Sequence, residues 1–336
     1  MVSKMKVGIS GFGRIGRMFL RAAAESGALG RDFDIALINT RSAVDINAHL
    51  FKYDSAQGKF PGTVEAGEDF ISVNGYRINW TRETQPENIP WGDHEVDVVI
   101  ESTGKFRKRE ECQAHLDAGA KRVIISAPGK DCPMIVPGVN MESADRNEKV
   151  FSLASCTTNC LGPVVKVLND AFGVKRGFMT TTHAYTNDQR TLDGSHKDWR
   201  RARAAAVSII PTSTGAAKAI GKVIPELEGK MDGFALRVPV ADGSITDITV
   251  EVEKETTAEE VNQKMREAAE GPLKGILQYL EEPLVSVDII GNPHSSILDS
   301  EFTKTSGNMV KVVSWYDNEY GYASRLIDFI KYMKSW

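Results

Sequence analysis

The residues that decide the fold are Lys6-Val7-Gly8-Ile9-Ser10, followed directly by Gly11-Phe12-Gly13-Arg14-Ile15-Gly16. The first five predict a strand, and apolar residues at helical spacing predict a helix from Ile15 onward, so the glycines lie in the turn between them. In such a turn Gly11 bends the chain tightly, Gly13 lets the backbone approach a pyrophosphate, and Gly16 lets helix and strand pack closely. The N–H groups at the helix start and the helix dipole then favour the phosphates.

A glycine-rich turn without a ligand is the alternative interpretation. Because the strand, the helix and the spacing all agree, we expect a dinucleotide bound by Gly11, Gly13, Arg14, Ile15 and Gly16. The helix should be amphipathic and should end near Gly27. Its apolar side carries Ile15, Met18, Phe19 and Ala22, and its solvent-exposed side carries Arg14, Arg17, Arg21 and Glu25.

Strand-like and helical segments alternate through the first half of the chain. Strands are predicted at 6–10, 34–39, 96–101 and 123–126, and helices at 15–24 and 109–118. This alternation is typical of βαβ units around a parallel sheet. After Cys156 the pattern changes to a helix at 161–172, strands at 177–183, 234–240, 245–252, 284–290 and 309–315, and a last helix at 319–333. Successive strands with few helices between them indicate a second, α+β domain with a mixed, largely antiparallel sheet.

The composition is that of a globular protein. The chain has 336 residues, of which 41% are hydrophobic and 26% charged, enough for two ordinary domains. The first residues leave no room for a signal peptide, and no apolar stretch is long enough to span a bilayer, so we expect a cytoplasmic protein without a membrane partner. Four cysteines at irregular spacing indicate reduced thiols rather than disulfides or a metal site. A net charge of -4 predicts no general attraction to nucleic acid.

The residues after the second predicted strand bear on the choice of coenzyme. In NAD-binding domains an acidic residue usually follows this strand and binds the ribose hydroxyls. Here Asn39 is followed by Thr40 and Arg41. A hydroxyl and a guanidinium can bind the additional phosphate of NADP, which a carboxylate would repel. NADP use, alone or beside NAD, is one hypothesis; the other is that Arg41 is a solvated loop residue and that the missing acid weakens NAD binding.

Cys156 is the candidate nucleophile. It lies at the start of the predicted helix, where the partial positive charge of the helix terminus favours thiolate over thiol. Most cysteines are inert core residues, and we assign Cys160 to that class. The polar residues around Cys156, Ser155-Cys156-Thr157-Thr158-Asn159, argue against a core position for it.

A reactive cysteine needs a histidine, which need not be near it in the sequence. The chain has six, at 49, 94, 115, 183, 196 and 294. His183 ends a strand-like run and precedes a polar turn, where side chains can converge on a site. Spacing alone leaves both His183 and His196 open.

Four motifs extend, in order, over nearly the whole chain. They are Gly11-Phe12-Gly13-Arg14-Ile15-Gly16-Arg17, Ser155-Cys156-Thr157-Thr158-Asn159-Cys160, His183-Ala184-Tyr185-Thr186-Asn187-Asp188-Gln189 and Trp315-Tyr316-Asp317-Asn318-Glu319. Together they closely resemble the glyceraldehyde-3-phosphate dehydrogenase family. The resemblance implies a homotetramer. It also implies a Rossmann-type, doubly wound α/β nucleotide-binding domain at 1–155, completed by a C-terminal helix at 319–336, and a catalytic domain at 156–318.

The resemblance also implies a reaction and its catalytic residues. Cys156 would add to the aldehyde of glyceraldehyde 3-phosphate, and His183 would take the hydroxyl proton and keep Cys156 ionised as an ion pair. Hydride would leave for NAD or NADP. Inorganic phosphate would then cut the thioester and release 1,3-bisphosphoglycerate, with water kept out of the site.

Further site residues follow from the same resemblance. The substrate's C3 phosphate would bind at Thr186, Asp188 and Arg237, and the attacking phosphate at Ser155, Thr157, Arg201, Thr214 and Gly215. Asn318 would orient the nicotinamide, while Thr103, Gly104 and Ser126 would line the cofactor channel.

The basic stretch from His196 to Arg203 is not expected to bind nucleic acid, because Asp198 interrupts it and the corresponding segment of the family reaches toward a neighbouring subunit's cofactor. NAD-specific relatives have a proline just before this stretch, which crowds the 2′-phosphate of NADP. Here Gly194-Ser195 resembles NADP-using forms, so Ser195 joins Thr40 and Arg41 in predicting NADP use.

Two other functions remain as alternatives. One is a sister dehydrogenase that acts on erythrose 4-phosphate and uses water as acyl acceptor, although Thr186-Asn187-Asp188 and Thr214-Gly215-Ala216-Ala217 resemble the phosphorylating family more. The other is a nucleotide-binding redox sensor without catalysis, in which Cys156 is the sensor.

Overall fold

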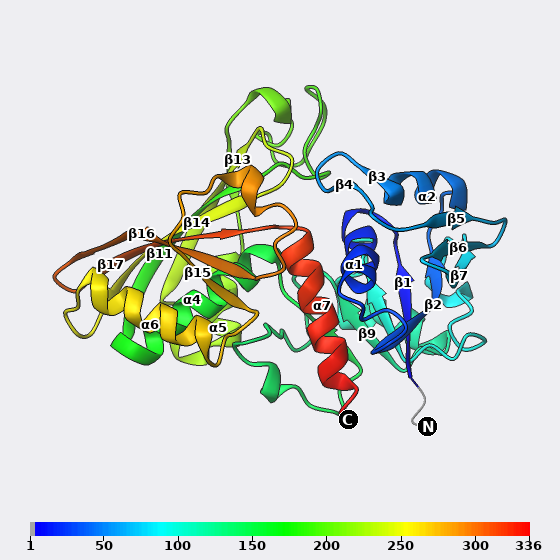
Figure 1. The fold of residues 1–336 in the computed structure, drawn as a ribbon, viewed down its shortest axis with the longest axis horizontal. Helices are drawn as coiled ribbons and strands as arrows, with labels where there is room; N and C mark the ends of the chain where they lie inside the picture. The colour runs from blue at the N-terminus through cyan, green and yellow to red at the C-terminus, as the bar shows by residue number, and fades with distance from the viewer. Residues whose placement is uncertain (1–3) are drawn as a thin grey trace. The chain divides into compact units, whose positions relative to one another are not determined.

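The structure is a computed structural model in which residues 4–336 are described. The chain forms two compact units (Figure 1). Unit 1 comprises Met1–Ile135, Met141–Ala154 and Ala323–Trp336, and unit 2 comprises Val136–Asn140 and Ser155–Tyr322. The last helix, α7 (Tyr320–Met333), is red in Figure 1.

Unit 1 is built on an eight-stranded sheet with the order β10-β9-β8-β1-β2-β7-β6-β5. Its strands are β1 (Met5–Ser10), β2 (Phe33–Asn39), β5 (Val64–Ala66), β6 (Phe70–Val73), β7 (Tyr76–Thr81), β8 (Val98–Glu101), β9 (Arg122–Ile125) and β10 (Val150–Ser152). A small hairpin, β3 (Tyr53–Asp54) with β4 (Gly58–Lys59), lies outside this sheet. Its helices are α1 (Arg14–Glu25), α2 (Val44–Lys52) and α3 (Arg109–Asp117), with short 3₁₀ turns η1 (Pro86–Asn88) and η2 (Met141–Ser143).

The strand order of unit 1 indicates where a ligand would bind. The pairs from β10 through β9, β8, β1 and β2 to β7 are all parallel, and only β5 and β6 run against their neighbours. From β1 the chain proceeds to β2 on one side and later to β8 on the other, so the connections diverge there. In doubly wound sheets, ligands bind beyond the carboxyl ends of the strands at this point. The predicted Rossmann-type α/β domain is confirmed in this sheet.

One residue of α1 differs from the sequence-based expectation. Arg21, predicted on the solvent-exposed side of the helix, is only 1% exposed. Its guanidinium donates hydrogen bonds to the carbonyl oxygens of Phe51 at 2.6 Å and Gly58 at 2.9 Å, and it lies over the ring of Phe60 at 5.7 Å. The prediction was wrong because the end of α2 and the segment after it cover this side of α1, and the helical period does not reveal what packs there.

Unit 2 is built on a seven-stranded sheet with the order β12-β13-β11-β14-β17-β16-β15. Its strands are β11 (Val174–Ala184), β12 (Ile210–Ser213), β13 (Met231–Val238), β14 (Ser244–Val252), β15 (Leu277–Leu280), β16 (Ser296–Ser306) and β17 (Met309–Tyr316). Its helices are α4 (Cys156–Phe172), α5 (Ala216–Val223) and α6 (Ala258–Glu270), with 3₁₀ turns η3 (Ala205–Val207), η4 (Pro225–Leu227) and η5 (Ser286–Ile289). Only β11 with β13 and β15 with β16 pair in parallel, which confirms the mixed, largely antiparallel sheet.

The strand predicted at 284–290 is wrong. This stretch forms η5, where Asp288 accepts a hydrogen bond from the backbone N–H of Val285 at 2.9 Å. Such a local side-chain bond offers the backbone an alternative to a sheet ladder. Besides β14, the strand that pairs with β17 is β16, which the sequence pattern did not predict.

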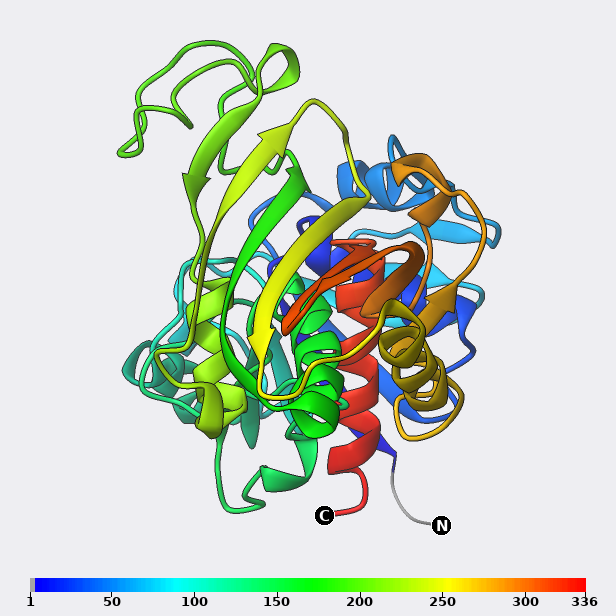
Figure 2. The same cartoon turned by 90° about the vertical axis from the view of Figure 1, so that its left-hand side faces the viewer.

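Helix α4, green in Figure 2, contacts β11, β14, β16 and β17 of the unit 2 sheet. Its apolar residues Leu161, Val164, Val165 and Leu168 are fully buried, as their spacing predicts. This packing fixes the position of the helix start, where Cys156 lies.

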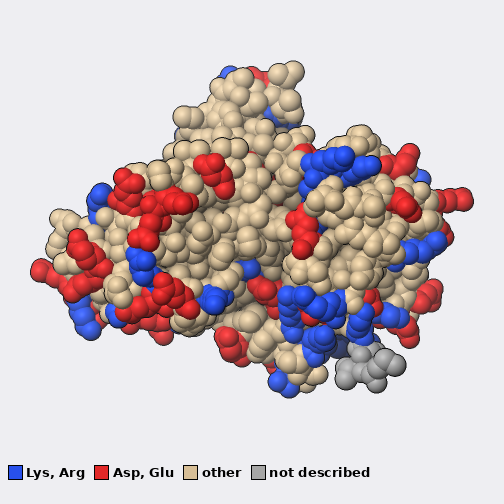
Figure 3. Space-filling model, viewed as in Figure 1, with Lys and Arg blue, Asp and Glu red and all other residues tan. Residues whose placement is uncertain are grey.

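Among residues 4–336, none of the helices has the length and apolar character that crossing a membrane requires. Acidic and basic side chains are interspersed on the face shown in Figure 3.

Candidate active site

The glycine-rich turn of unit 1 has the geometry of an anion cradle. Gly11 has a φ of +90°, and its N–H donates to the carbonyl of Asn39 at 2.8 Å. A Cβ added to Gly16 would lie 2.4 Å from the carbonyl oxygen of Gly11, so only glycine permits this packing. Gly13 is the N-cap of α1 and no side chain caps the helix there; a Cβ added to it would meet nothing within 4 Å. The start of α1 therefore faces open space, which suits the pyrophosphate of a dinucleotide.

A cavity of about 240 Å³ adjoins this turn. It is lined by Ser10, Gly11, Phe12, Gly13, Asn39, Thr40, Arg41, Glu83, Thr84, Pro86, Ile89, Ser102, Thr103, Lys105 and Phe106. Five other predicted cofactor residues of unit 1, Arg14, Ile15, Gly16, Gly104 and Ser126, are not among the residues that line it. The Arg14 guanidinium forms an ion pair with Asp54, so its contribution to a cofactor site is limited to its backbone at the helix start.

The side chain of Asn39 shapes the wall of this cavity. Its Oδ1 accepts from the N–H of Glu83 at 2.9 Å, and its Nδ2 donates to the carbonyl of Glu83 at 3.1 Å. Asn39 therefore holds the segment after β7 against the end of β2. That contact brings a carboxylate, Glu83, to the cavity that also contains Thr40 and the exposed Arg41. Sequence reasoning missed Glu83 and Lys105, because nothing in their own segments indicates which strand end they approach.

In unit 2, Cys156 and His183 lie together. Cys156 is the first residue of α4, and the preceding Ser155 caps the helix by accepting from the N–H of Thr158 at 3.1 Å. The Cys156 Sγ is 3.4 Å from Nε2 of His183, near the end of β11. The structure thus distinguishes the two histidines that spacing left open. His196 lies beside Asp188 instead, with Nε2 3.4 Å from its Oδ1.

Contacts with Ala184, Arg237 and Tyr316 hold the His183 ring in place. Its Nδ1 is 2.7 Å from the carbonyl oxygen of Ala184 and 2.7 Å from Nη1 of Arg237, which the parallel register of β11 and β13 places opposite it. The ring of Tyr316 meets it edge-on at 5.8 Å, and the Tyr316 hydroxyl lies 2.9 Å from Oγ1 of Thr157. The Ala184 carbonyl only accepts and therefore favours a proton on Nδ1, whereas the Arg237 guanidinium only donates and disfavours it. In the tautomer with its proton on Nδ1, the Nε2 atom faces the sulfur as an acceptor. The ring therefore has a place for the thiol proton.

Burial disfavours a lone charge on either member of this pair. Desolvation raises the pKa of Cys156 to about 11, although Arg237 and hydrogen bonds with Thr157 lower it. Desolvation, followed by Arg237, lowers the pKa of His183 to about 3, while the bond to Ala184 raises it. Moving the proton from Sγ to Nε2 creates both charges at once, so they attract one another. The ionised pair stays a prediction, in which the mutual attraction of the two charges would offset the cost of burying them.

Arg237 is the candidate anion ligand nearest to the pair. Among the described residues, its Nε is buried and has no hydrogen-bond partner. An unpaired, buried guanidinium N–H is costly unless a ligand completes it. A phosphate is suited to this position because it accepts charge-assisted hydrogen bonds from guanidinium.

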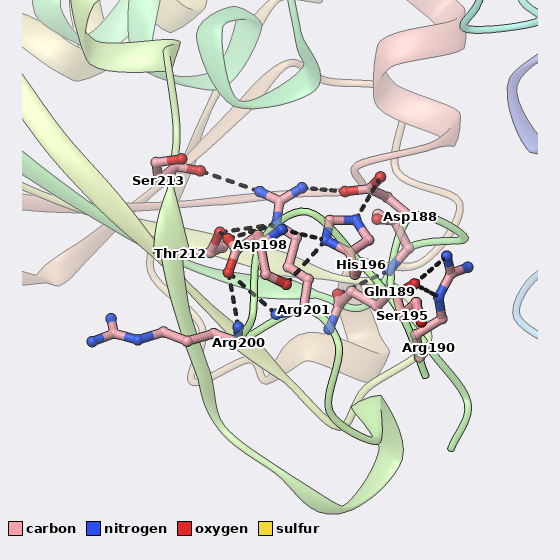
Figure 4. Close-up of polar contacts among 11 residues, drawn as sticks. Asp188, Gln189, Arg190, Ser195, His196, Asp198, Arg200, Arg201, Thr212 and Ser213 are labelled. Carbon is pink, nitrogen blue, oxygen red and sulfur yellow. Dashed lines mark hydrogen bonds and ion pairs between the residues drawn. The ribbon is translucent and has the colours of Figure 1, made fainter. Parts of the chain in front are cut away.

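Arg201 lies in a polar cluster that Figure 4 shows in close-up. Its guanidinium pairs with Asp188, donates to Oγ1 of Thr212 at 2.8 Å and donates to the carbonyl of Ser213 at 3.2 Å. The Asp188 carboxylate is thereby paired with Arg201, and its hydrogen bonds with Arg201 and His196 lower its pKa against the effect of burial. Asp188 therefore positions Arg201, and it is not itself suited to contact a phosphate.

The remaining predicted phosphate residues lie at helix starts and in one turn. Ser155 and Thr157 belong to the first turn of α4, and Thr214 and Gly215 immediately precede α5, which contacts α4. The Thr214 hydroxyl accepts from the N–H of Ala216 at 3.2 Å, and a Cβ added to Gly215 would meet nothing within 4 Å. Thr186 lies in the turn after β11, where its N–H donates to Gln189 Oε1 at 3.2 Å. Helix starts with open space beside them are suited to anions.

Asn318 is buried and held in one orientation. Its Oδ1 accepts from the Ser244 hydroxyl at 2.6 Å, which leaves the amide nitrogen as its other end. The neighbouring Asp317 caps α7 by accepting from the N–H groups of Glu319 and Tyr320 at 2.8 and 2.7 Å. Ser195, by contrast, is exposed, and its carbonyl accepts from Nη2 of Arg190 at 2.7 Å (Figure 4).

A dinucleotide cradle in unit 1 and, in unit 2, a half-buried thiol beside a buried imidazole define a dehydrogenase that uses a cysteine nucleophile. Comparison with known proteins agrees. Residues 5–109 match the family described as "Glyceraldehyde 3-phosphate dehydrogenase, NAD binding domain", and residues 155–318 match "Glyceraldehyde 3-phosphate dehydrogenase, C-terminal domain".

Curated relatives cover nearly the whole chain. A glyceraldehyde-3-phosphate dehydrogenase from Mycolicibacterium smegmatis is 54% identical over 97% of both chains, and one from Geobacillus stearothermophilus is 53% identical over 98% of both. A glyceraldehyde-3-phosphate dehydrogenase 1 from Saccharomyces cerevisiae is 48% identical over 98% of this chain and 99% of its own. The chain belongs to the glyceraldehyde-3-phosphate dehydrogenase family.

Proposed function

We propose that this protein oxidises glyceraldehyde 3-phosphate with inorganic phosphate and NAD(P)⁺, giving 1,3-bisphosphoglycerate and NAD(P)H. The observation that carries the proposal is the 3.4 Å approach of Cys156 Sγ to His183 Nε2 beside the buried Nε of Arg237, which has no partner among the described residues. Nucleophile, base and anion ligand are thus within one site, as a phosphorylated aldehyde requires.

The chain's residues account for the covalent steps. His183 Nε2 takes the thiol proton, the Cys156 sulfur adds to the aldehyde carbon, and His183 returns the proton to the former carbonyl oxygen, which gives a thiohemiacetal. His183 then accepts the hydroxyl proton as the carbon is oxidised, which leaves a thioester on Cys156. The nicotinamide, when bound, accepts the hydride. A phosphate oxygen attacks the thioester, the C–S bond breaks, and the thiolate is restored.

The two phosphates would bind at different groups of residues. We place the substrate's C3 phosphate with Thr186, Asp188 and Arg237, where Arg237 supplies the charge and Asp188, which pairs with Arg201, does not itself contact the phosphate. We place the attacking phosphate with Ser155, Thr157, Arg201, Thr214 and Gly215, at the starts of α4 and α5. The Thr157 hydroxyl is already paired with Tyr316, so the backbone N–H groups of the first turn of α4 would contribute there.

The site is tested by two substitutions at the reacting pair. Cys156→Ser removes the nucleophile and should abolish aldehyde-dependent reduction of NAD(P)⁺. His183→Asn removes the base and should lower kcat by about 10²- to 10⁴-fold. His196→Asn is the matched control, because it removes the other candidate histidine, and it should retain far more activity than His183→Asn. Steady-state rates that rank the two histidine variants the other way would contradict the assignment.

We also propose that NADP is used well. Thr40 and Arg41 line the cavity of unit 1 and Ser195 is exposed in unit 2, while Glu83 adds an opposing carboxylate to the cavity. Arg41→Ala should lower kcat/KM for NADP more than for NAD, and Glu83→Gln should raise the NADP to NAD ratio by about five- to tenfold, since it removes a repulsion from the 2′-phosphate. Steady-state kinetics with both coenzymes decide this. A wild-type kcat/KM for NAD about tenfold above that for NADP would reject a preference for NADP.

The sister reaction with erythrose 4-phosphate is the second candidate among dehydrogenases. It differs by using water as acyl acceptor, so omission of phosphate separates the two.

We place the dinucleotide in the domain of residues 1–155, completed by 319–336, and catalysis in 156–318. A homotetramer in the cytoplasm is part of the proposal, and light scattering of the purified protein measures the assembly.

A further inference from the structure

A buried polar chain lies behind the dinucleotide cavity of unit 1. His115 is 0% exposed and Glu101 is 1% exposed, and Nε2 of His115 is 3.0 Å from Oε2 of Glu101. On the other side of the ring, Nε1 of the fully buried Trp91 donates to Nδ1 of His115 at 3.1 Å. Neither Glu101, His115 nor Trp91 lines the cavity, and the proposed reaction uses none of them.

The direction of every hydrogen bond in this chain is fixed by chemistry. The indole N–H of Trp91 is a donor only, so Nδ1 of His115 must accept and carries no proton. The imidazole proton of neutral His115 is therefore on Nε2, which donates to Glu101. Trp91 in this way selects the tautomer, and His115 presents a donor to the carboxylate.

The same carboxylate holds the loop that borders the cavity. Oε1 of Glu101 accepts from the backbone N–H of Thr103 at 2.8 Å and also from the Thr103 hydroxyl. The backbone carbonyl of Glu101 accepts from the N–H and the hydroxyl of Ser126, each at 3.0 Å. Two residues expected to line the cofactor channel, Thr103 and Ser126, are thus both bound to Glu101.

The loop after β8 in turn supports the glycine-rich turn. The Ser102 hydroxyl donates to the carbonyl of Gly11 at 2.6 Å. A Cβ added to Gly11 would lie 2.8 Å from the N of Thr103, so the two backbones are in close contact. A shift of Thr103 would therefore displace the turn that receives the pyrophosphate.

We propose that Trp91, His115 and Glu101 are positioning residues that set the affinity for the dinucleotide by holding Thr103 against the glycine-rich turn. The proposal rests on the dinucleotide site of the proposed function. It assigns these residues no contact with cofactor or substrate. Their effect should appear in binding and in KM for the dinucleotide, while kcat at saturating cofactor is unchanged.

Glu101→Gln is the direct test, because it leaves the shape of the side chain intact. A carboxamide must turn its NH2 either toward the Thr103 N–H or toward the His115 Nε2–H, and both arrangements place two donors against each other. We expect the Kd for NAD and NADP to rise about tenfold, with kcat within about twofold of the wild type. Amide hydrogen exchange at Thr103 should also become faster, as its acceptor is lost. Glu101→Asp, which shortens the side chain, serves the same purpose if the glutamine variant does not fold.

Trp91→Phe supplies a rescue that a purely structural role would not produce. Without the indole N–H, His115 can place its proton on Nδ1 and accept through Nε2 from the carboxamide NH2 that Glu101→Gln introduces. The carboxamide oxygen can then accept from Thr103 again. The double variant Glu101→Gln/Trp91→Phe should therefore bind dinucleotide several-fold more tightly than Glu101→Gln alone, although the smaller ring makes it less stable. Affinity that falls further in the double variant would overturn the proposal.

Asp299→Asn is the matched control. Asp299 is a buried carboxylate, 4% exposed, that accepts from the indole Nε1 of Trp315 at 3.1 Å in unit 2. Its loss should reduce stability without raising the dinucleotide Kd. If wild-type protein binds neither NAD nor NADP in calorimetric titration, the proposed function itself fails. If wild-type protein binds and Glu101→Gln binds equally well, only the positioning role fails.

Discussion

Arg237 is the single residue that connects substrate binding with the chemistry of Cys156. It lowers the pKa of both Cys156 and His183, and burial lowers its own pKa. A cation at this position favours the thiolate and disfavours the imidazolium, so its two effects on the ion pair oppose each other. A bound substrate phosphate would offset this positive charge and so weaken both effects, which favours protonation of His183 and disfavours the Cys156 thiolate.

Removing this charge should shift the pH dependence of thiol reactivity. In Arg237→Leu the cation that lowers the Cys156 pKa is absent, so that pKa should rise and the midpoint of the alkylation rate with iodoacetamide should move to higher pH, by about one unit. The measurement is the alkylation rate of Cys156 between about pH 5 and 10 in protein without substrate. Arg176→Leu is the control, since Arg176 is on the same sheet but exposed and paired with Glu251. A midpoint that moves to lower pH would contradict this role for Arg237.

Arg21 shows how a charged residue can belong to a core. Its guanidinium is buried, with backbone carbonyls at the end of α2 and in the segment after it as acceptors. Arg21→Met keeps most of the apolar contact but leaves those carbonyls without their donor, which should lower the free energy of unfolding by about 2–4 kcal/mol. Urea denaturation measures this, with the exposed Arg31→Met as control. Equal stability of the two variants would show that the buried hydrogen bonds do not matter.

At the scale of elements, the structure separates two uses of glycine in the turn between β1 and α1. Gly16 is required for packing, because a Cβ there would meet the Gly11 carbonyl at 2.4 Å. Gly13 has open space beside it and is free of this constraint. If the dinucleotide binds as we propose, glycine is required at position 13 because a side chain there would contact the ligand.

This difference predicts distinct effects of two alanine substitutions. Gly16→Ala should lower both thermal stability and dinucleotide affinity, since the helix must move away from the strand. Gly13→Ala should leave the melting temperature of the ligand-free protein within about 2 °C but weaken NAD and NADP binding by about tenfold or more. Melting curves with and without dinucleotide measure both quantities. Unchanged affinity in Gly13→Ala would show that the pyrophosphate does not lie at the start of α1.

At the scale of the whole molecule, the sequence predicted the features that depend on residues close together in the chain. The turn at Gly11–Gly16, the helix that begins at Cys156 and the alternation of elements in unit 1 depend on spacing along the chain, and all are present in the structure. Residues brought together from distant segments were not predicted. No pattern within one segment predicts that Glu83 lies beside Asn39 or that Arg21 donates to the carbonyl of Gly58. The spacing of the histidines likewise does not predict that His183, rather than His196, lies beside Cys156. The stretch 284–290 failed for a related reason, since Val285 and Val287 are exposed in a 3₁₀ turn and the sequence does not show that they lie outside the sheet.

The buried Glu101–His115–Trp91 chain belongs to this second class. His115 is on α3 and Glu101 ends β8, while Trp91 precedes that strand, and only the folded unit makes them neighbours. In the sequence His115 is only one of six histidines. The signal that could have found it, a donor-only indole facing an imidazole, exists only in three dimensions.

The proposed reaction depends on Cys156 carrying the substrate as a thioester that phosphate, and not water, cleaves. Rapid mixing of the protein with glyceraldehyde 3-phosphate and NAD(P)⁺ in the absence of phosphate, followed by mass spectrometry of the quenched chain, examines this step itself. We expect about one equivalent of reduced cofactor per chain, an acyl adduct on Cys156, and turnover that resumes when phosphate is added. Sustained turnover without phosphate, or an adduct on any residue other than Cys156, would refute the mechanism.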